Sequence, residues 1–407
     1  MGAATPTTHD AIIKHMYPDP NDVLVAMYEN NTLFAFLKKS FDGYGKNWHL
    51  PVRIAHTAGR SHSFDKASAN KNASAVVEYQ INVTQNYSLY SVDGRLQRQT
   101  ANSKGAFVEA FEFELDSAMD AMKRNMGYEP FLNGGGAIGR VGSGQTTQTV
   151  TLLNINDIVK FEKNQPIVAS VADGTSGAVK FGQVTAGSID RDLGTITVTQ
   201  PTWDDPTGIP TIAANDFLFT AGDFGLGIKG LEAWVPATAP TLGDSFFALD
   251  RSVDPVRLAG SRLDVRTLGP EEQIQKMCQV SARNGGKLSH IFQNDLDFLA
   301  LILALGSRRI TVNTEVDATV GFEGVKVATG VGTVEVYSDY NNTQGVAWGL
   351  DLDKWEIKGP GQFPFIEARD GNKILRADSA DAFDGRIIGY YQMQSKKVAG
   401  SVRARLT

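Results

Sequence analysis

The sequence predicts an α+β chain in which an extended β-loop, a long helix and a small inserted β domain join a mixed α/β core. Three observations carry this prediction: an alternating stretch with a polar tip over residues 43–100, a helical periodicity after residue 103, and short strand patterns over residues 145–223. The 407 residues suffice for two or three domains, and a hydrophobic content of 42% can bury real cores.

Residues 1–42 are predicted to form an N-terminal arm with one helix. Val23, Met27, Leu33 and Phe36 recur at helical spacing in "DPNDVLVAMYENNTLFAFLKKS". Residues 43–100 differ, because "WHLPVRIAH" and "ASAVVEYQINVTQNYSLYSV" alternate polar with apolar residues, as strands do. A small, polar loop lies between them. A two-stranded excursion of this kind has little core of its own, so we expect it to rest on another surface.

The stretch from residue 103 predicts a long helix. Apolar residues recur at spacings of four, four, three and four, which places them on one helical face, namely Phe107, Phe111, Leu115, Ala118 and Met122. Gly127 is the expected left-handed stop of this helix. About 23 residues at 1.5 Å each give a rod of about 34 Å.

Residues 145–223 contain strand patterns broken by Gly, Asn and Asp, which predict a small barrel or sandwich inserted in the main domain. After residue 225 the chain returns to mixed structure. "PEEQIQKMCQVSARNGG" and "DLDFLALILALGS" predict helices, and "GVKVATGVGTVEVYSD" and "GRIIGYYQMQSKKVAGSVRARL" predict strands.

The motifs that could carry chemistry are weak. Two G-x-G-x-x-G matches begin at Gly134 and Gly225, but neither lies between a strand and a proper helix, as a dinucleotide site requires. We read them as connectors at domain junctions. The six histidines lack metal-ligand spacing, and Cys278 lies in a helical pattern as a small buried residue. We therefore expect no catalytic, cofactor-binding or metal-binding residues and no cofactor.

The charge pattern is more informative than the motifs. Residues 43–104 carry eight basic residues against three acidic ones, whereas residues 105–122 carry five acidic residues and no basic one. The two stretches offer complementary surfaces to neighbouring copies, although solvated faces would show the same pattern. The candidate inter-subunit contacts are Arg53, Arg60, Lys66, Lys71, Arg95, Arg98, Glu109, Glu112 and Asp116. The net charge of −6 argues against a dedicated nucleic-acid binder.

The order of these parts resembles the major capsid proteins of tailed bacteriophages, the Hong Kong 97-type fold shared with herpesvirus shells and encapsulins. The stretches that carry the resemblance are "YSLYSVDGRLQRQTANSKGAFVEAFEFELDSAMDAMKRNMGYEPFLNGGG", "GLGIKGLEAWVPA" and "ADSADAFDGRIIGYYQMQSKKVAGSVRARL". The likeness covers nearly the whole chain in its architecture, and no single motif is diagnostic.

The resemblance implies a domain plan in which the long helix is the spine of a peripheral domain. The expected parts are the arm 1–42, the extended loop 43–100, the spine helix and start of the peripheral domain 101–144, the inserted β domain 145–223, the return to the peripheral domain 224–265, the axial α/β domain 266–365 and closing peripheral strands 366–407.

The resemblance also implies a role and partners. Copies would form hexamers and pentamers in an icosahedral virion shell around double-stranded DNA, made in the bacterial host cytoplasm, with only weak, non-specific contact to the DNA. Portal and decoration proteins are further expected partners, and the short arm implies either a separate scaffold protein or a scaffolding segment that was removed. An encapsulin-like nanocompartment is the nearest alternative, and a dinucleotide-binding enzyme using Gly225, Gly227 and Gly230 is a distant one.

Overall fold

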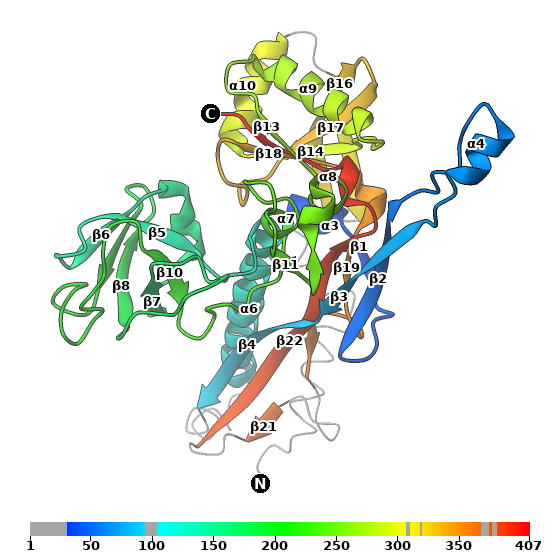
Figure 1. Cartoon of the computed structure of the whole chain (residues 1–407). Helices are drawn as coiled ribbons and strands as arrows, with labels where there is room; N and C mark the ends of the chain where they lie inside the picture. Colours follow the sequence, from blue (N-terminus) through cyan, green and yellow to red (C-terminus); the bar gives the residue numbers. More distant parts are fainter. Residues whose placement is uncertain (1–30, 94–103, 307–309, 318–319, 368–373, 377–380) are drawn as a thin grey trace.

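The computed structural model describes residues 31–93, 104–306, 310–317, 320–367, 374–376 and 381–407. These residues form a central body from which three other parts extend: a hairpin, a closed barrel and a domain built on a seven-stranded sheet (Figure 1). The expected α+β class, with its extended β-loop, long helix and small barrel, is confirmed.

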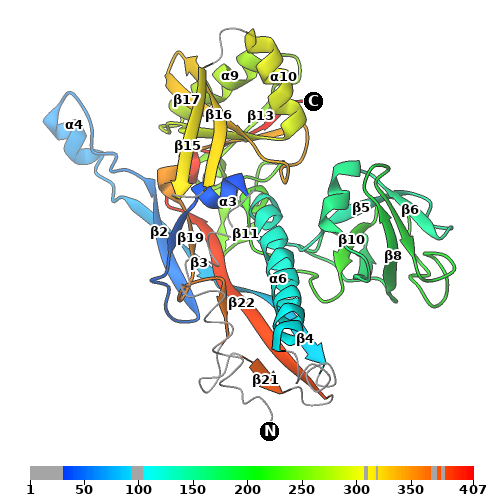
Figure 2. The ribbon, with the colours of Figure 1, turned by 180° about the vertical axis from the view of Figure 1, so that it is seen from behind.

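The body is a six-stranded sheet covered by one long helix. Its longest strand is β22 (Ala382–Ser395), which pairs with β4 (Thr84–Asp93) along the whole length of β4. The other strands are β1 (Lys38–Ser40), β19 (Trp355–Lys358), β20 (Phe365–Ile366) and β21 (Ile374–Arg376). The helix α6 (Lys104–Tyr128) has 25 residues, or about 37 Å, and lies along β4 and β22 (Figure 2).

The buried side of α6 follows the predicted periodicity. Leu115, Ala118 and Met122 are buried, together with Met119 and Met126. The predicted stop at Gly127 is wrong, because the helix continues through it to Tyr128. A side chain at this position would collide with the Asn31 side chain, so the glycine lets the arm approach the helix.

The hairpin consists of β2 (Asn47–Ala55) and β3 (Ala75–Asn82), and its tip carries the short helix α4 (Phe64–Ala69). It is shorter than the expected excursion over residues 43–100. The strand β4 turns away from the hairpin and pairs with β22 in the body. The sequence of β4 alternates as that of β3 does, so the pattern predicts a strand without showing its partner.

The barrel closes in the strand order β10-β5-β6-β9-β8-β7. Its strands are β5 (Gly139–Ser143), β6 (Thr149–Leu152), β7 (Pro166–Ser170), β8 (Val184–Asp190), β9 (Thr195–Val198) and β10 (Phe217–Thr220), with the 3-10 turn η2 (Ile155–Lys160) beside them. The barrel therefore starts ahead of the expected boundary at residue 145. Its core contains Phe161, Trp203 and Leu218, all fully buried, and Tyr128 from the end of α6 joins that core.

The two glycine-rich segments, which begin at Gly134 and Gly225, are the connections through which the chain enters and leaves the barrel. They lie side by side, and the Gly225 N–H donates to the Gly135 carbonyl at 2.8 Å. The first segment leads into β5, and the second leads into α7 (Leu231–Trp234), a helix of only four residues. This placement agrees with their interpretation as connectors at a domain junction.

The fourth part, called here the seven-stranded domain, has the order β13-β23-β18-β14-β17-β16-β15. Its strands are β13 (Ser261–Asp264), β14 (His290–Gln293), β15 (Ile310–Asp317), β16 (Val320–Thr329), β17 (Gly332–Ser338), β18 (Val346–Leu350) and β23 (Val402–Arg405). The helices α9 (Pro270–Arg283) and α10 (Asp295–Leu305) share one hydrophobic core with the sheet.

Two expected boundaries of this domain differ from the structure. The closing strand β23 was expected with the peripheral strands 366–407, but it pairs with β13 and β18 in the seven-stranded sheet. Conversely, β19 lies inside the expected axial range 266–365 and pairs with β22 in the body. The chain therefore crosses between the six-stranded sheet and the seven-stranded sheet more often than a division of the sequence into consecutive domains predicts.

The remaining described elements connect these parts. They are α3 (Thr32–Phe36), α8 (Pro255–Ala259), the short ladder of β11 (Ser245–Phe246) with β12 (Leu249–Asp250), and the 3-10 turns η1 (Glu129–Phe131), η3 (Arg251–Val253), η5 (Leu352–Lys354) and η6 (Val398–Gly400).

Candidate inter-subunit surfaces

The inner half of the hairpin is fixed to its own chain. Trp48, Tyr79 and Ile81 are buried in the core of the body. The Tyr79 hydroxyl donates to the Leu258 carbonyl at 2.8 Å, and the Trp48 indole N–H donates to Gln394 Oε1 at 2.7 Å. These contacts hold the base of the hairpin at a set angle to the body.

The outer half of the hairpin is supported only in part. Val52, Ile54 and Val77 pack against the core of the body, and the Arg257 guanidinium donates to the Ile54 carbonyl, whereas the tip beyond residue 55 shows no such contact among the described residues. The tip helix α4 contains no buried residue, and Phe64 at its start is 85% exposed. On the adjoining strand, Val76 is 60% exposed. Both views show α4 projecting away from the rest of the molecule (Figures 1 and 2). Two strands and a short helix bury too little apolar surface to be stable alone, so this half is suited to contact with another molecule.

The predicted basic residues of the hairpin are all on its surface. Arg53, Arg60, Lys66 and Lys71 are exposed. The predicted acidic partner Asp116 is also exposed, on α6. The structure does not bring the two groups together within one chain, since the tip points away from α6 in both views.

The other four predicted contact residues fall where side chains are not described. Arg95 and Arg98 lie outside the described residues. Glu109 and Glu112 lie within the bounds of α6, but their side chains are outside the described set.

The C-terminal end of α6 makes an ionic contact with the barrel that sequence reasoning did not identify. The Arg124 guanidinium pairs with the Glu162 carboxylate, and Arg191 of the barrel donates to the same carboxylate at 2.8 Å. The two guanidinium groups share one acceptor and fasten the barrel to the helix. The only signal in the sequence is the basic end of α6, which gives no hint of a partner so distant along the chain.

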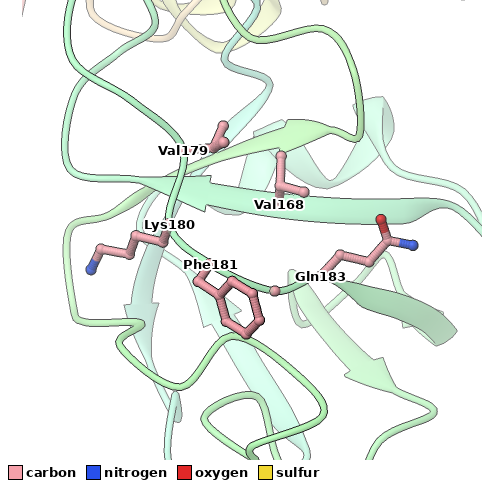
Figure 3. Close-up of a pocket in the computed structure, with 6 residues that line it drawn as sticks. Val168, Val179, Lys180, Phe181 and Gln183 are labelled. Carbon is pink, nitrogen blue, oxygen red and sulfur yellow. The ribbon is translucent and has the colours of Figure 1, made fainter.

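A shallow hollow lies on the outside of the barrel (Figure 3). Its lining includes Val168, Val179 and Phe181, the last 84% exposed. The one ionisable group in the lining is Lys180, which pairs with Asp216 at 2.5 Å and donates to the Thr211 carbonyl at 2.6 Å. Because that ammonium group is already bound, the hollow offers an apolar surface without an available acid, base or nucleophile.

A buried carboxyl group joins the arm to the seven-stranded domain, and sequence reasoning missed it. Asp339 follows β17 and accepts hydrogen bonds from the N–H groups of Leu33 and Asn341, each at 3.0 Å. Burial raises the pKa of Asp339 to about 7, even though both donors favour the ionised form. The sequence gives no sign that Asp339 is buried, because one of its donors, Leu33, lies 306 positions away along the chain.

Within the described part of the chain, no cluster of three or more His, Cys, Asp or Glu side chains has the arrangement of a metal site. A search of the same residues for a helix long and apolar enough to cross a membrane also found none.

Comparisons with known proteins give likeness of overall arrangement only. No protein-family model matches the chain, and no curated protein matches it. Among solved structures, a capsid protein of cyanophage A-1(L) is 12% identical, with a TM-score of 0.49 over 93% of this chain and 92% of that one.

Two further solved structures come from cellular organisms. The SrpI encapsulin of Synechococcus elongatus PCC 7942 is 7% identical, with a TM-score of 0.46 over 92% of this chain and 86% of that one. A virus-like particle from Pyrococcus furiosus is 8% identical, with a TM-score of 0.36 over 94% and 96%. Because these scores are all below 0.5, we base the function on the surfaces of the chain itself.

Proposed function

We propose that this chain is a major capsid protein, a structural subunit that assembles with identical copies into the icosahedral shell around the double-stranded DNA of a tailed phage. The observation that carries the proposal is the hairpin, whose base is buried in its own chain while its tip helix contains no buried residue. Because its base is fixed to the body, the hairpin projects its exposed tip in a defined direction, where it can contact a neighbouring molecule.

The charges support a neighbouring copy as the surface under the hairpin. The exposed basic residues of the hairpin, such as Lys66 and Lys71, are opposite in charge to the exposed acidic residues Glu114, Asp116 and Asp120 on α6. Attraction of this kind sets orientation and register, even where each exposed pair contributes only about 0.2–1 kcal/mol. In a shell of hexamers and pentamers the same contact is repeated in every subunit.

The proposal includes partners beyond the chain itself. A separate scaffold protein would assist assembly, a portal would occupy one vertex, and decoration proteins would bind the finished shell. DNA inside the shell would touch the subunits weakly and without sequence preference, because the chain carries a net charge of −6.

Electron microscopy of the expressed chain tests the proposal. The chain, alone or with its scaffold, is expected to form hollow particles in negative stain. A variant in which a short Gly–Ser turn replaces residues 58–72 is expected to keep the fold of the monomer and form none. Compact monomers under all conditions would overturn the proposal. Particles that enclose a cellular enzyme in place of DNA would identify a nanocompartment instead.

A further inference from the structure

One face of α10 is apolar and uncovered. Leu301 and Leu305 are buried against the sheet, whereas Leu296, Leu299 and Leu303 on the other side are 53%, 49% and 72% exposed. Ala300 and Ala304 are exposed between them, which completes helical spacings of three and four. We call these five residues the α10 stripe.

The neighbouring helix α9 shows that this is not a general property of the domain. Its exposed side carries Gln275, Lys276, Gln279 and Arg283, as expected for a helix facing water. Both helices pack on the same sheet, so their difference lies in what covers the outer side. A contiguous apolar helix face on an otherwise polar surface marks a contact with another molecule.

The helix is held firmly enough to present that face. At its N-terminus the Asn294 side chain accepts from the Leu296 N–H, and Asp297 Oδ2 accepts from the Gly345 N–H at 2.7 Å. Asp295 and Asp297 are the only charged residues of α10. An anionic neighbour, whether nucleic acid or lipid headgroups, would be repelled by these carboxylates.

The opposite flank of the same domain ends in an open sheet edge. Among the described residues, β15 pairs only with β16, so its outer backbone groups lack a strand partner. Both views place α10 on one side of the domain and the β15–β16 hairpin on the other (Figures 1 and 2). Proteins commonly cover such an edge with a helix, which prevents uncontrolled strand pairing.

We propose that the α10 stripe of one copy packs against the β15 edge of the next copy around a ring. Two different patches on opposite flanks make a head-to-tail contact, which closes into a ring when the rotation between copies is right. The occupant of the stripe is thus a second copy of this chain. This inference rests on the proposed function and names the surfaces that join subunits within a hexamer or pentamer.

Substitution of the stripe tests the contact. The double variant Leu299→Gln and Leu303→Gln is expected to melt at the wild-type temperature, because both side chains face water in the monomer. It is expected to form neither rings in native mass spectrometry nor shells in negative stain. The matched control on α9, Gln275→Ser with Gln279→Ser, is expected to assemble normally. A stripe variant that assembles like the wild type would overturn the inference.

Cross-linking tests the direction of the contact. The chain has one cysteine, Cys278, which is buried. Oxidation of the double variant Leu303→Cys and Thr311→Cys is expected to give a ladder of products beyond the dimer, whereas neither single variant gives one. Dimers from Leu303→Cys alone would show a symmetric pairing of α10 with itself and overturn the head-to-tail contact.

The two proposals fail in different ways. Wild-type chains that form no particles, even with scaffold, would remove the proposed function and this inference with it. Wild-type shells accompanied by normal shells from the stripe variant would remove the inference alone.

Discussion

The barrel and the hairpin are both built from short antiparallel strands, yet they bury their apolar side chains in different places. The barrel joins its first and last strands, β5 and β10, and fills its interior with its own side chains. Among the described strands, β2 and β3 of the hairpin pair only with each other, and the core that their buried side chains enter belongs to the body. A closed sheet is complete within one chain, whereas an open ribbon needs another surface.

The difference teaches where function lies in this molecule. The barrel, which could fold by itself, has an apolar hollow whose one ionisable lining group, Lys180, is already paired with Asp216. The part that cannot stand alone carries exposed basic residues and an exposed aromatic side chain at its tip. Incomplete burial in the monomer is therefore the feature that points to assembly.

The largest expected effect is in the barrel core. Trp203→Ala removes a fully buried side chain and leaves a cavity, which is expected to lower the free energy of unfolding of the barrel by about 3–5 kcal/mol. Leu193→Ala, at a 63% exposed position of the same barrel, is expected to change it by less than about 0.5 kcal/mol. Urea unfolding followed by circular dichroism measures both. Equal effects would contradict the self-contained barrel.

A second prediction concerns the joint between the arm and the seven-stranded domain. The pKa of Asp339 is raised from 3.8 to about 7, so the folded chain binds an extra proton between these values. The free energy of unfolding is therefore expected to fall as pH rises from about 4 to about 8, by about 2–4 kcal/mol. Asp339→Asn is expected to lose this part of the pH dependence. A variant whose urea midpoints retain the wild-type pH profile would contradict this assignment.

The sequence predicted the elements of this fold better than their partners. Periodicity located the buried side of α6, and alternation located the strands of the barrel, because both signals are local. The pairing of β4 with β22, the passage of the arm over Gly127 and the contact of Arg124 with Glu162 depend on residues far apart in sequence. Of the predicted contact residues, the exposure of the hairpin cations follows from composition, whereas their partner surface requires a second molecule.

A matched pair of exposed aromatic residues sharpens the comparison of barrel and hairpin. Phe64 at the hairpin tip is 85% exposed, and Phe181 on the barrel is 84% exposed. Serine at either position is expected to change monomer stability by less than about 0.5 kcal/mol. Only Phe64→Ser is expected to reduce the yield of particles, as counted by electron microscopy. A stronger assembly defect in Phe181→Ser would place the main contact on the barrel.

The smallest expected effect is that of the surface charges. Reversal of Glu112 and Asp116 to Lys is expected to leave the monomer folded and to slow assembly, followed by light scattering, more strongly at low salt. Asp192→Lys on the barrel is the control for a reversed surface charge. Reversing Lys66 and Lys71 to Glu in the same chain is expected to restore part of the rate. If the Glu112 and Asp116 reversals have no effect at any salt concentration, charge does not guide docking.

Hydrogen–deuterium exchange of residues 56–74, in free subunits and in assembled particles, tests most directly whether the hairpin tip takes its support from a neighbouring copy. The account predicts fast exchange of these amides in the free subunit and strong protection after assembly, while the barrel strands are protected in both states. Tip amides that exchange equally fast in subunits and particles, or that are already protected in the free subunit, would contradict it.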